Sequence, residues 1–427
     1  MKIESGFEEK RLKELEPGDL FFFQPSFYIK TDGVSDGLCE CVDIESGFIE
    51  LIGPDVKVGI VEDATLKIGG YYKCNLEYYD IRKDIEKYPD AWCYIIYSHR
   101  GPGKTYSTLR MAVDDKIPIV YMKRTNLDVD MICTYDDDVD LSPYKPLNRD
   151  FGWHIFPHKI KEGFGAFYDN IDDNGKPIGK PISYLMSVSA VHKFKGFDLS
   201  EVDWMVFDEF IPPIGERLNR KEGDMLMELY MTLSRDRIKR GRKPLKLILL
   251  ANASCISTPI TNSLEVTDRM AEMEAQGLAW DYDFDRNIFI HHLIEEKFQI
   301  MQKDDPVVKA LGDTAWGRMA FGGEFAYNDF SNVQLFSLKG MAPQVHIKFK
   351  THDYYVYYRA HDSMYYMCTS ATNIKVPFFD LNRENDQKRF YIEWDIDLRE
   401  SCIEERMKFQ RYSMYDLIVN YKNFFKV

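Results

Sequence analysis

The amino-acid sequence predicts an α/β protein with a parallel central sheet, preceded by a small β domain and followed by an α+β domain. Apolar segments of strand length alternate with helical segments through the middle of the chain, whereas short segments of alternating polarity occupy both ends. At 427 residues the chain is also too long for one ordinary core. We therefore expect domains at 1–72, 73–265 and 331–427, with 266–330 as a linker or lid region.

The central sheet is predicted from continuous apolar segments, which are typical of strands buried on both faces. The candidate strands are 92–97, 117–122, 184–188, 202–207 and 245–250. Leu226, Leu229 and Leu233 recur at helical spacing between the last two candidates, which predicts a helix over 224–233 packed on the sheet. This alternation favours strands joined by crossover helices.

The N-terminal domain is predicted from turns and short apolar strands. Pro17, Gly18 and Asp19 form a turn before the apolar segment 20–23, and further short apolar segments follow up to Gly69-Gly70. The spacing fits a compact barrel of SH3-like size. Nothing at residue level indicates what this domain does.

The C-terminal domain is predicted from period-two segments that return after Pro343. The expected strands are 345–349, 354–358, 365–368 and 391–397, with a hairpin turn at His361-Asp362-Ser363. We also expect a helix from Ser401 in which Glu404 pairs with Lys408. Its apolar face would comprise Ile403, Met407, Met414 and Leu417.

Composition and charge exclude some classes of protein. A formal net charge of −14 excludes a protein coated in basic surface, but a ring-shaped motor needs positive charge only where a DNA strand passes. The eight cysteines are scattered without a CxxC pair, which indicates reduced cytosolic thiols. Cys39 and Cys41 are either a metal pair or ordinary strand residues, and the lack of a second Cys/His pair nearby favours the latter.

The sequence shows no signal for a membrane. Residues 1–11 carry charges where a signal peptide needs an apolar segment, and no apolar run approaches about 18 residues. We therefore expect the protein to remain in the cytoplasm.

A glycine-rich loop after the first central strand is the strongest chemical signal. The loop and its flanking residues are Ser98, His99, Arg100, Gly101, Pro102, Gly103, Lys104, Thr105 and Tyr106. In the pattern GxxxxGK[ST], glycines let backbone N–H groups face nucleotide phosphates, the lysine reaches the β and γ phosphates, and the hydroxyl ligates Mg²⁺. Ser98 stands where the pattern has glycine, and a chance Gly-rich turn is the alternative. The loop predicts a P-loop NTPase with ATP and Mg²⁺ as cofactors.

An acidic pair follows the buried strand at 204–207. Asp208 at the end of this strand is expected to hold Mg²⁺, and Glu209 is expected to polarise the attacking water as general base. Acidic residues also commonly open surface loops, but about 100 residues behind a P-loop the pair is a strong signal. Asn252, at the end of the next strand, could sense the γ-phosphate, or could simply belong to a polar turn.

The most basic segment of the chain, 235–243, lies between Glu209 and that next strand. A solvated charge run is the usual explanation. An arginine finger directed at a neighbouring subunit's nucleotide is the sharper hypothesis, with Arg235 as our choice and Arg237 as the alternative. Lys195 is a second candidate cation for a neighbour's phosphates, or a lysine on a surface loop.

The motif order resembles the DNA-encapsidation ATPases of phi-29-like small tailed phages, relatives of terminase large subunits. The resembling stretches are SHRGPGKTY, MVFDEFI, LSRDRIKRGR followed by LILLANAS, WGRMAFGGEF and VYYRAHDSMYYM. They run from about residue 75 to the C-terminus. Residues 1–72 have no counterpart in the phi-29 pattern.

The resemblance implies an ATPase core of the terminase-like ASCE type and a C-terminal domain similar to a degenerate RNase H-like nuclease. It also implies a homopentameric ring at the portal of a prohead in the host cytoplasm, translocating double-stranded DNA, with a packaging RNA as a further partner. By the same resemblance Lys104 is the Walker A lysine, Asp208 the Mg²⁺ carboxylate, Glu209 the catalytic glutamate and Arg235 the trans-acting arginine. Lys195 falls where the family has a second trans-acting basic residue.

DNA contacts and nuclease activity remain open at this point. Lys123, Arg124, Lys159 and Lys161 either line a DNA pore or are ordinary surface residues. Two-metal cleavage needs converging carboxylates, and the candidates are Asp353, Asp362, Asp380, Asp395 and Asp397. The alternation of Glu393, Asp395 and Asp397 with apolar residues favours an exposed strand face instead. The rival functions are a terminase with a working nuclease and a nucleotide-dependent scaffold without motor action.

Overall fold

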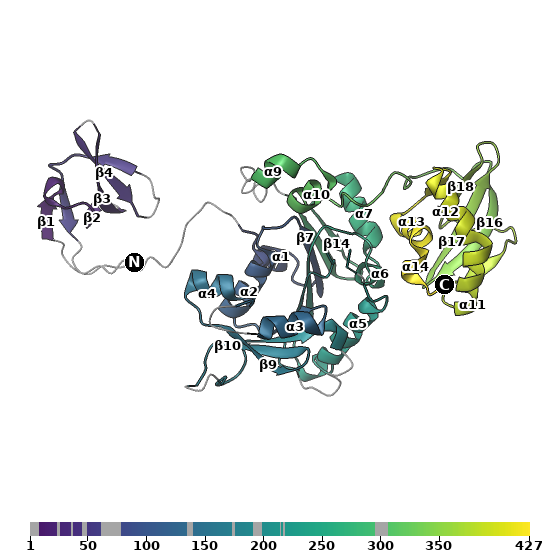
Figure 1. Cartoon of the computed structure of the whole chain (residues 1–427), viewed down its shortest axis with the longest axis horizontal. Helices are drawn as coiled ribbons and strands as arrows, with labels where there is room; N and C mark the ends of the chain where they lie inside the picture. Colours follow the sequence, from purple (N-terminus) through teal and green to yellow (C-terminus); the bar gives the residue numbers. More distant parts are fainter. Residues whose placement is uncertain are drawn as a thin grey trace. The chain divides into compact units, whose positions relative to one another are not determined.

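The computed structural model separates into two compact units, Met1–Gly69 and Gly70–Val427 (Figure 1). Each unit is described by itself. The residues described are 8–23, 26–35, 37–44, 49–60, 78–134, 140–172, 176–190, 199–213, 215–216, 218–294 and 306–427.

The N-terminal unit is a six-stranded antiparallel sheet in the order β1-β6-β2-β3-β4-β5. Its elements are β1 (Glu8–Arg11), η1 (Leu12–Glu14), β2 (Leu20–Phe23), β3 (Ser26–Ser35), β4 (Leu38–Asp43), β5 (Ile49–Ile52) and β6 (Lys57–Ile60). Phe21, Tyr28 and Val58 pack in its core together with Cys39 and Cys41. Both cysteines are buried residues of β4, which confirms their interpretation as ordinary strand residues.

The central sheet of the second unit has nine strands in the order β14-β15-β7-β13-β12-β8-β11-β10-β9. The inner strands run parallel: β7 (Cys93–Ser98), β8 (Ile119–Lys123), β11 (Ser183–Ser187), β12 (Trp204–Asp208), β13 (Lys246–Asn252) and β15 (Ile288–Leu293). Antiparallel strands complete both edges: β9 (Phe156–Lys161), β10 (Phe164–Tyr168) and β14 (Trp280–Asp283). The five predicted central strands are confirmed.

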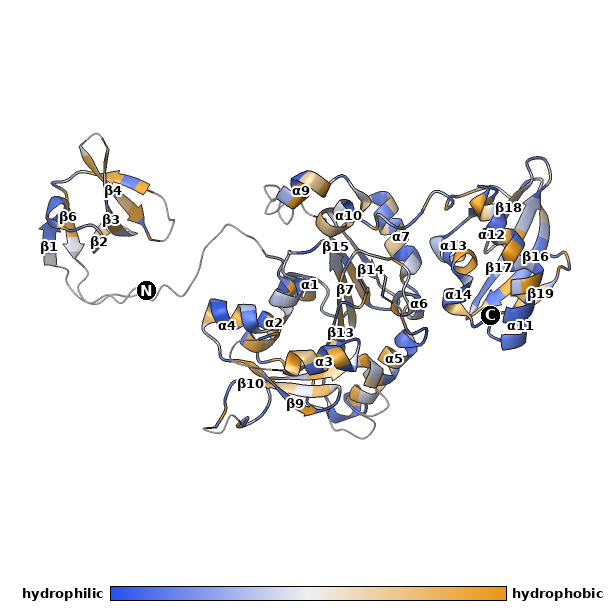
Figure 2. Cartoon of the chain, in the orientation of Figure 1, coloured by the Kyte–Doolittle hydropathy of each residue, from blue (hydrophilic) through white to orange (hydrophobic). Residues whose placement is uncertain are grey.

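Helices cover both faces of this sheet. Its central strands are therefore buried on both faces and consist mostly of apolar residues, which Figure 2 shows in orange. One face is covered by α1 (Ile81–Lys87), α2 (Lys104–Asp114), α3 (Asn126–Cys133) and α4 (Lys145–Phe151). The other is covered by α5 (Glu222–Leu233), α6 (Pro259–Ser263) and α7 (Thr267–Gln276). Alternate residues of β7 point to opposite cores, with Cys93 and Ile95 in one and Tyr94 and Ile96 in the other.

The central sheet continues beyond residue 265, where the sequence had indicated a linker or lid. β15 pairs in parallel with β7, and the short helices α9 (Pro306–Leu311), α10 (Ala315–Gly317) and η5 (Arg318–Gly322) follow. The apolar residues of β15 lie between charged segments, which hid the strand from the pattern analysis. The parallel sheet therefore includes a strand from the predicted linker.

The C-terminal domain is a five-stranded mixed sheet in the order β19-β16-β17-β18-β20 with helices packed on it. Its strands are β16 (Ala342–Phe349), β17 (His352–Arg359), β18 (Met364–Cys368), β19 (Phe378–Asp380) and β20 (Met407–Phe409). Its helices are α11 (Glu384–Phe390), η6 (Tyr391–Asp395), α12 (Ile396–Ile403), α13 (Tyr412–Val419) and α14 (Tyr421–Phe424). The predicted hairpin between β17 and β18 is confirmed.

Two predictions for this domain were wrong. The segment 391–397 is helical: Asp395 is buried, whereas Ile392 and Ile396, which period two would place on one face with the buried Phe390 and Leu398, are exposed. The helix expected from Ser401 ends at Ile403, and β20 interrupts it before α13. Glu404 pairs with Arg406 instead of Lys408.

Candidate nucleotide-binding site

The loop between β7 and α2 has the backbone of a phosphate-binding loop. Gly101 and Gly103 have φ values of 103° and 90°, which non-glycine residues rarely adopt. A Cβ on Gly103 would also lie 2.8 Å from the Tyr78 ring, so both the backbone conformation and the contact with Tyr78 require glycine here. The loop delivers the chain to the N-terminus of α2, whose first backbone N–H groups have no partner within the helix.

Lys104 is held inside this loop with only 8% of its surface exposed. Its Nζ donates to Ser98 Oγ at 2.5 Å and to Asn252 Oδ1 at 3.3 Å. Burial lowers the pKa of Lys104 to about 7, although the Asp208 carboxylate opposes this shift. Ser98, the departure from the glycine pattern, thus acts as a hydrogen-bond acceptor for Lys104.

Asp208 and Thr105 place two oxygen atoms side by side. Thr105 Oγ1 lies 3.1 Å from Asp208 Oδ1, while Tyr121 donates to Asp208 Oδ2 at 2.5 Å. Hydroxyl and carboxylate oxygens are the ligands that Mg²⁺ prefers, with water and phosphate oxygens completing its coordination. The donor set at this position therefore fits Mg²⁺.

Glu209 turns out of the sheet immediately after β12. It is a non-glycine residue with a φ of +61°, a sparsely populated conformation that is often found at functional sites. Its side chain is 54% exposed, and Lys123 Nζ approaches its Oε2 to 3.1 Å. The main-chain turn exposes this carboxylate while Asp208 beside it remains largely buried.

These groups line a cavity of about 380 Å³. The cavity contains the predicted site residues Arg100, Gly101, Gly103, Lys104, Thr105, Tyr106, Asp208, Glu209 and Asn252. It also contains residues that were missed: Tyr78, Pro146, Arg149, Asp150 and Ala251. Tyr78 precedes α1, and Arg149 and Asp150 belong to α4, so the fold brings them to the loop with no local motif to reveal them.

A segment from the predicted lid region packs on the back of the loop. Arg100 N donates to Ala320 O at 3.1 Å, and a Cβ on Gly323 would lie 2.6 Å from the backbone nitrogen of His99. His292 of β15 lies 2.8 Å from the carbonyl of Gly323. Gly323 of the WGRMAFGGEF stretch thus allows close contact with this loop.

The two candidate arginine fingers differ sharply. Arg235 lies just beyond α5 and is exposed, outside the cavity of its own chain. Arg237 is 1% exposed and bonds to Asp203 and to the carbonyls of Val202 and Lys243. The alternative prediction, that Arg237 is the finger, was therefore wrong, because its guanidinium is buried and hydrogen-bonded within its own chain. Lys195 lies outside the described residues.

The proposed DNA-contacting residues occupy different surroundings. Lys123 lies beside the acidic pair, with Nζ 3.3 Å from Asp208 and 3.1 Å from Glu209. Arg124 is 11% exposed in its side chain and bonds to Glu222 at 2.6 Å. On the sheet edge, Lys159 is half exposed and pairs with Asp130, and Lys161 ends β9. The structure thus places Lys123, Arg124 and Lys159 against acidic residues.

The fold and site together define the class: a P-loop-like α/β core with an acidic pair at the end of one of its parallel strands. Neither the protein-family models nor the curated proteins contain a match. Among solved structures, the chain is similar to the Phi-28 gp11 DNA packaging motor, with a TM-score of 0.54 and 16% identity over 82% of this chain and 99% of that one. The bacteriophage Phi-29 viral genome packaging motor assembly gives a TM-score of 0.52 and 15% identity, with the same coverage of each chain. At these identities the likeness shows the fold.

Among the described residues, no helix is long and apolar enough to span a membrane.

Proposed function

We propose that this chain is the ATPase of a bacteriophage DNA packaging motor. The observation that carries the proposal is the convergence of Lys104, Thr105, Asp208 and Asn252 at the ends of β7, β12 and β13. The likeness in fold to the Phi-28 and Phi-29 motors supports packaging over other uses of such a site. Hydrolysis of ATP to ADP and phosphate would drive the movement of double-stranded DNA into a prohead.

The site residues fit Mg-ATP. Backbone N–H groups of the loop and the Lys104 ammonium would hold the phosphates, and Thr105 and Asp208 would hold Mg²⁺. Mg²⁺, when bound, supplies a Lewis acid that neutralises phosphate charge. Glu209 would accept the proton of the attacking water as general base, and its exposed carboxylate leaves room for that water. Asn252 touches Lys104 and would therefore respond to the γ-phosphate.

We propose that Arg235 completes the site of a neighbouring subunit in a homo-oligomeric, pentameric ring. Arg235 is exposed near Met231 and Ile238, whose side chains are 67% and 66% exposed. Exposed apolar residues beside an exposed arginine are typical of a protein interface. Lys195 is proposed as the second trans-acting cation on the resemblance alone. The portal, the prohead and a packaging RNA are proposed partners on the same ground.

The C-terminal domain is proposed to be a degenerate RNase H-like domain without cleavage activity. Four of its five candidate carboxylates are paired with basic residues: Asp353 with His346, Asp362 with Arg359, Asp380 with Arg383 and Asp395 with Arg399. Asp395 is fully buried in the helical segment η6. Metal-dependent DNA cutting by the purified protein, abolished by Asp395→Ala, would contradict this assignment. The N-terminal sheet is proposed to close into a small barrel.

The function is tested by measuring hydrolysis of Mg-ATP by the wild-type chain and two variants. Lys104→Ala should lose nucleotide binding, whereas Glu209→Gln should bind ATP and hydrolyse it at least about a hundredfold more slowly. DNA and prohead should stimulate the wild-type rate. If the Glu209→Gln protein hydrolyses ATP at the wild-type rate, Glu209 is not the general base, and the result would favour a nucleotide-dependent scaffold.

A further inference from the structure

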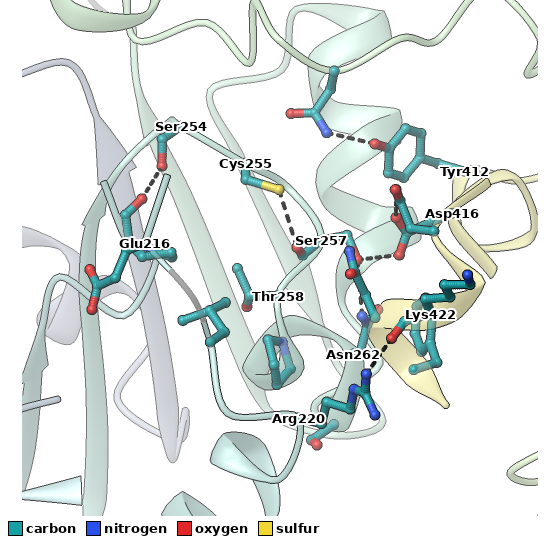
Figure 3. Close-up of a pocket in the computed structure, with 18 of the residues that line it drawn as sticks. Glu216, Arg220, Ser254, Cys255, Ser257, Thr258, Asn262, Tyr412, Asp416 and Lys422 are labelled. Carbon is teal, nitrogen blue, oxygen red and sulfur yellow. Dashed lines mark hydrogen bonds between the residues drawn. The ribbon is translucent and has the colours of Figure 1, made fainter. Parts of the chain in front are cut away.

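The chain segments that follow β12 and β13 line a pocket together with helices of the C-terminal domain (Figure 3). Ser254, two residues beyond the end of β13, donates through Oγ to the carbonyl of Pro212 at 2.5 Å. Pro212 in turn lies three residues beyond Glu209. This hydrogen bond joins the two segments directly after the residues that face the nucleotide.

The segment after β13 ends on a buried carboxyl group of α13. Ser257 Oγ donates to Asp416, which is 4% exposed, and Asn420 donates to the other Asp416 oxygen at 2.8 Å (Figure 3). Burial raises the pKa of Asp416, while the hydrogen bonds from Ser257 and Asn420 lower it. Loss of the Ser257 donor would remove one of the hydrogen bonds that stabilise this largely buried carboxyl group.

A second contact runs beside the first. Ile256 N donates to Asn328 Oδ1 at 3.3 Å, and Asn328 Nδ2 donates to Tyr412 Oη at 2.5 Å. Only five positions separate Asn252, which accepts a hydrogen bond from Lys104, from Ser257. A shift of Asn252 on nucleotide binding would therefore reach α13 through a short, hydrogen-bonded segment.

The surroundings leave space for such a shift. A cavity of about 780 Å³ lies between this segment and helices α13 and α14. Arg220, from the segment after β12, donates across it to the carbonyl of Lys422 at 2.7 Å. Since tightly packed cores resist gradual deformation, a contact bordered by open space is where two packed parts can change their relative position.

We propose that Ser257 and Asp416 are positioning residues that transmit the occupancy of the nucleotide site to the C-terminal domain. The inference rests on the proposed ATP binding, because it assigns the route by which that binding acts on α13. In this role the pair leaves nucleotide binding and hydrolysis intact and determines whether α13 and α14 respond to them.

A plain docking contact between the domains is the competing explanation, and the chain offers a matched control. Ser413, also on α13, donates through Oγ to Asp268 of α7 at 2.7 Å. This hydrogen bond also joins the C-terminal domain to the ATPase core. Asp268, however, lies on α7, eleven positions beyond Ser257, so this contact does not involve the short segment between Asn252 and Ser257. Ser413→Ala removes a hydrogen bond of the same kind without breaking the proposed route.

The test is hydrogen–deuterium exchange of the full chain with and without the ATP analogue AMP-PNP and Mg²⁺. In the wild type, the analogue should protect the phosphate loop and change exchange of the 412–424 amides about tenfold. Ser257→Ala and Asp416→Asn should keep loop protection and lose the change at 412–424, while Ser413→Ala keeps both. Asp416→Asn preserves the side-chain shape, so it separates loss of transmission from loss of folding.

Three results would overturn the proposal: no change at 412–424 in the wild type, an unaltered change in Ser257→Ala, or an equal loss in Ser413→Ala. Absence of loop protection in the wild type would instead show that the chain does not bind ATP, and the proposed function would fail first. In packaging, Ser257→Ala should hydrolyse ATP normally while moving about tenfold less DNA per ATP. Normal DNA movement per ATP would count against the proposal.

Discussion

The affinity for ATP should fall as pH rises, because Lys104 starts from a low pKa. Burial lowers the pKa of its ammonium group to about 7 before nucleotide is present. Phosphates bound beside Nζ would raise that pKa toward its ordinary value or above. The ATP-bound form therefore holds a proton that the free form loses above pH 7. Full affinity is present below pH 7 and is lost as pH rises through and beyond 7.

The size of the effect follows from that value. With a pKa of 7 in the free protein, protonated Lys104 is about 90% of the total at pH 6 and about 1% at pH 9. If only the protonated form binds ATP, the dissociation constant rises about 90-fold between these pH values, which corresponds to about 2.7 kcal/mol.

Isothermal titration calorimetry with Mg-ATP at pH 6, 7, 8 and 9 measures this dependence. Lys104→Arg is the matched control, since its guanidinium stays protonated from pH 6 to 9 and the variant shares the titration of ATP itself. The wild-type dissociation constant should rise more steeply with pH than that of the variant, and binding should take up protons from the buffer at pH 8. Equal slopes for both proteins would refute the reasoning.

Three further predictions concern single residues. Arg235→Ala should leave the melting temperature within about 2 °C of wild type and remove DNA-stimulated hydrolysis. Arg237→Ala should instead lower the free energy of unfolding by about 3 kcal/mol in denaturant, because it leaves buried carbonyls without a donor. Unchanged stability of Arg237→Ala would contradict its placement in the core. Gly103→Ala should abolish ATP binding in calorimetry, since its Cβ meets the Tyr78 ring and its φ of 90° is strained for alanine; near-normal affinity would contradict the loop geometry. Asp208→Asn should weaken Mg²⁺-dependent ATP binding at least about tenfold while leaving metal-free binding nearly unchanged, and an equal loss in both would argue against a Mg²⁺ ligand.

Much of the fold was predictable because buried parallel strands are written as continuous apolar segments. The strand before Ser98 and the one before Asp208 both have this form, and each ends at a polar residue with a chemical role. Where polarity alternates briefly, the sequence is ambiguous. Seven residues from 391 to 397 match period two as well as a helix, and the burial of Asp395 beside exposed Ile392 and Ile396 decides between them.

The site was predictable only where its residues belong to a local motif. Lys104, Thr105 and Asp208 follow from the phosphate loop and the strand end, but Tyr78 and Arg149 enter the cavity from separate elements that share no motif. Lys123, which we expected to line a DNA pore or to be an ordinary surface residue, lies beside the acidic pair because, like Asp208, it ends a parallel strand. Because the carboxyl ends of β8 and β12 lie at one edge of the parallel sheet, their terminal residues meet, and Lys123 faces the acidic pair.

The central claim, a DNA packaging motor driven by ATP, is tested most directly by ATP-dependent protection of DNA from nuclease inside a prohead. The wild-type chain should protect genome-length double-stranded DNA only with hydrolysable ATP and Mg²⁺, and Glu209→Gln should protect none while still binding ATP. Full protection by Glu209→Gln, or wild-type protection without ATP, would contradict the account.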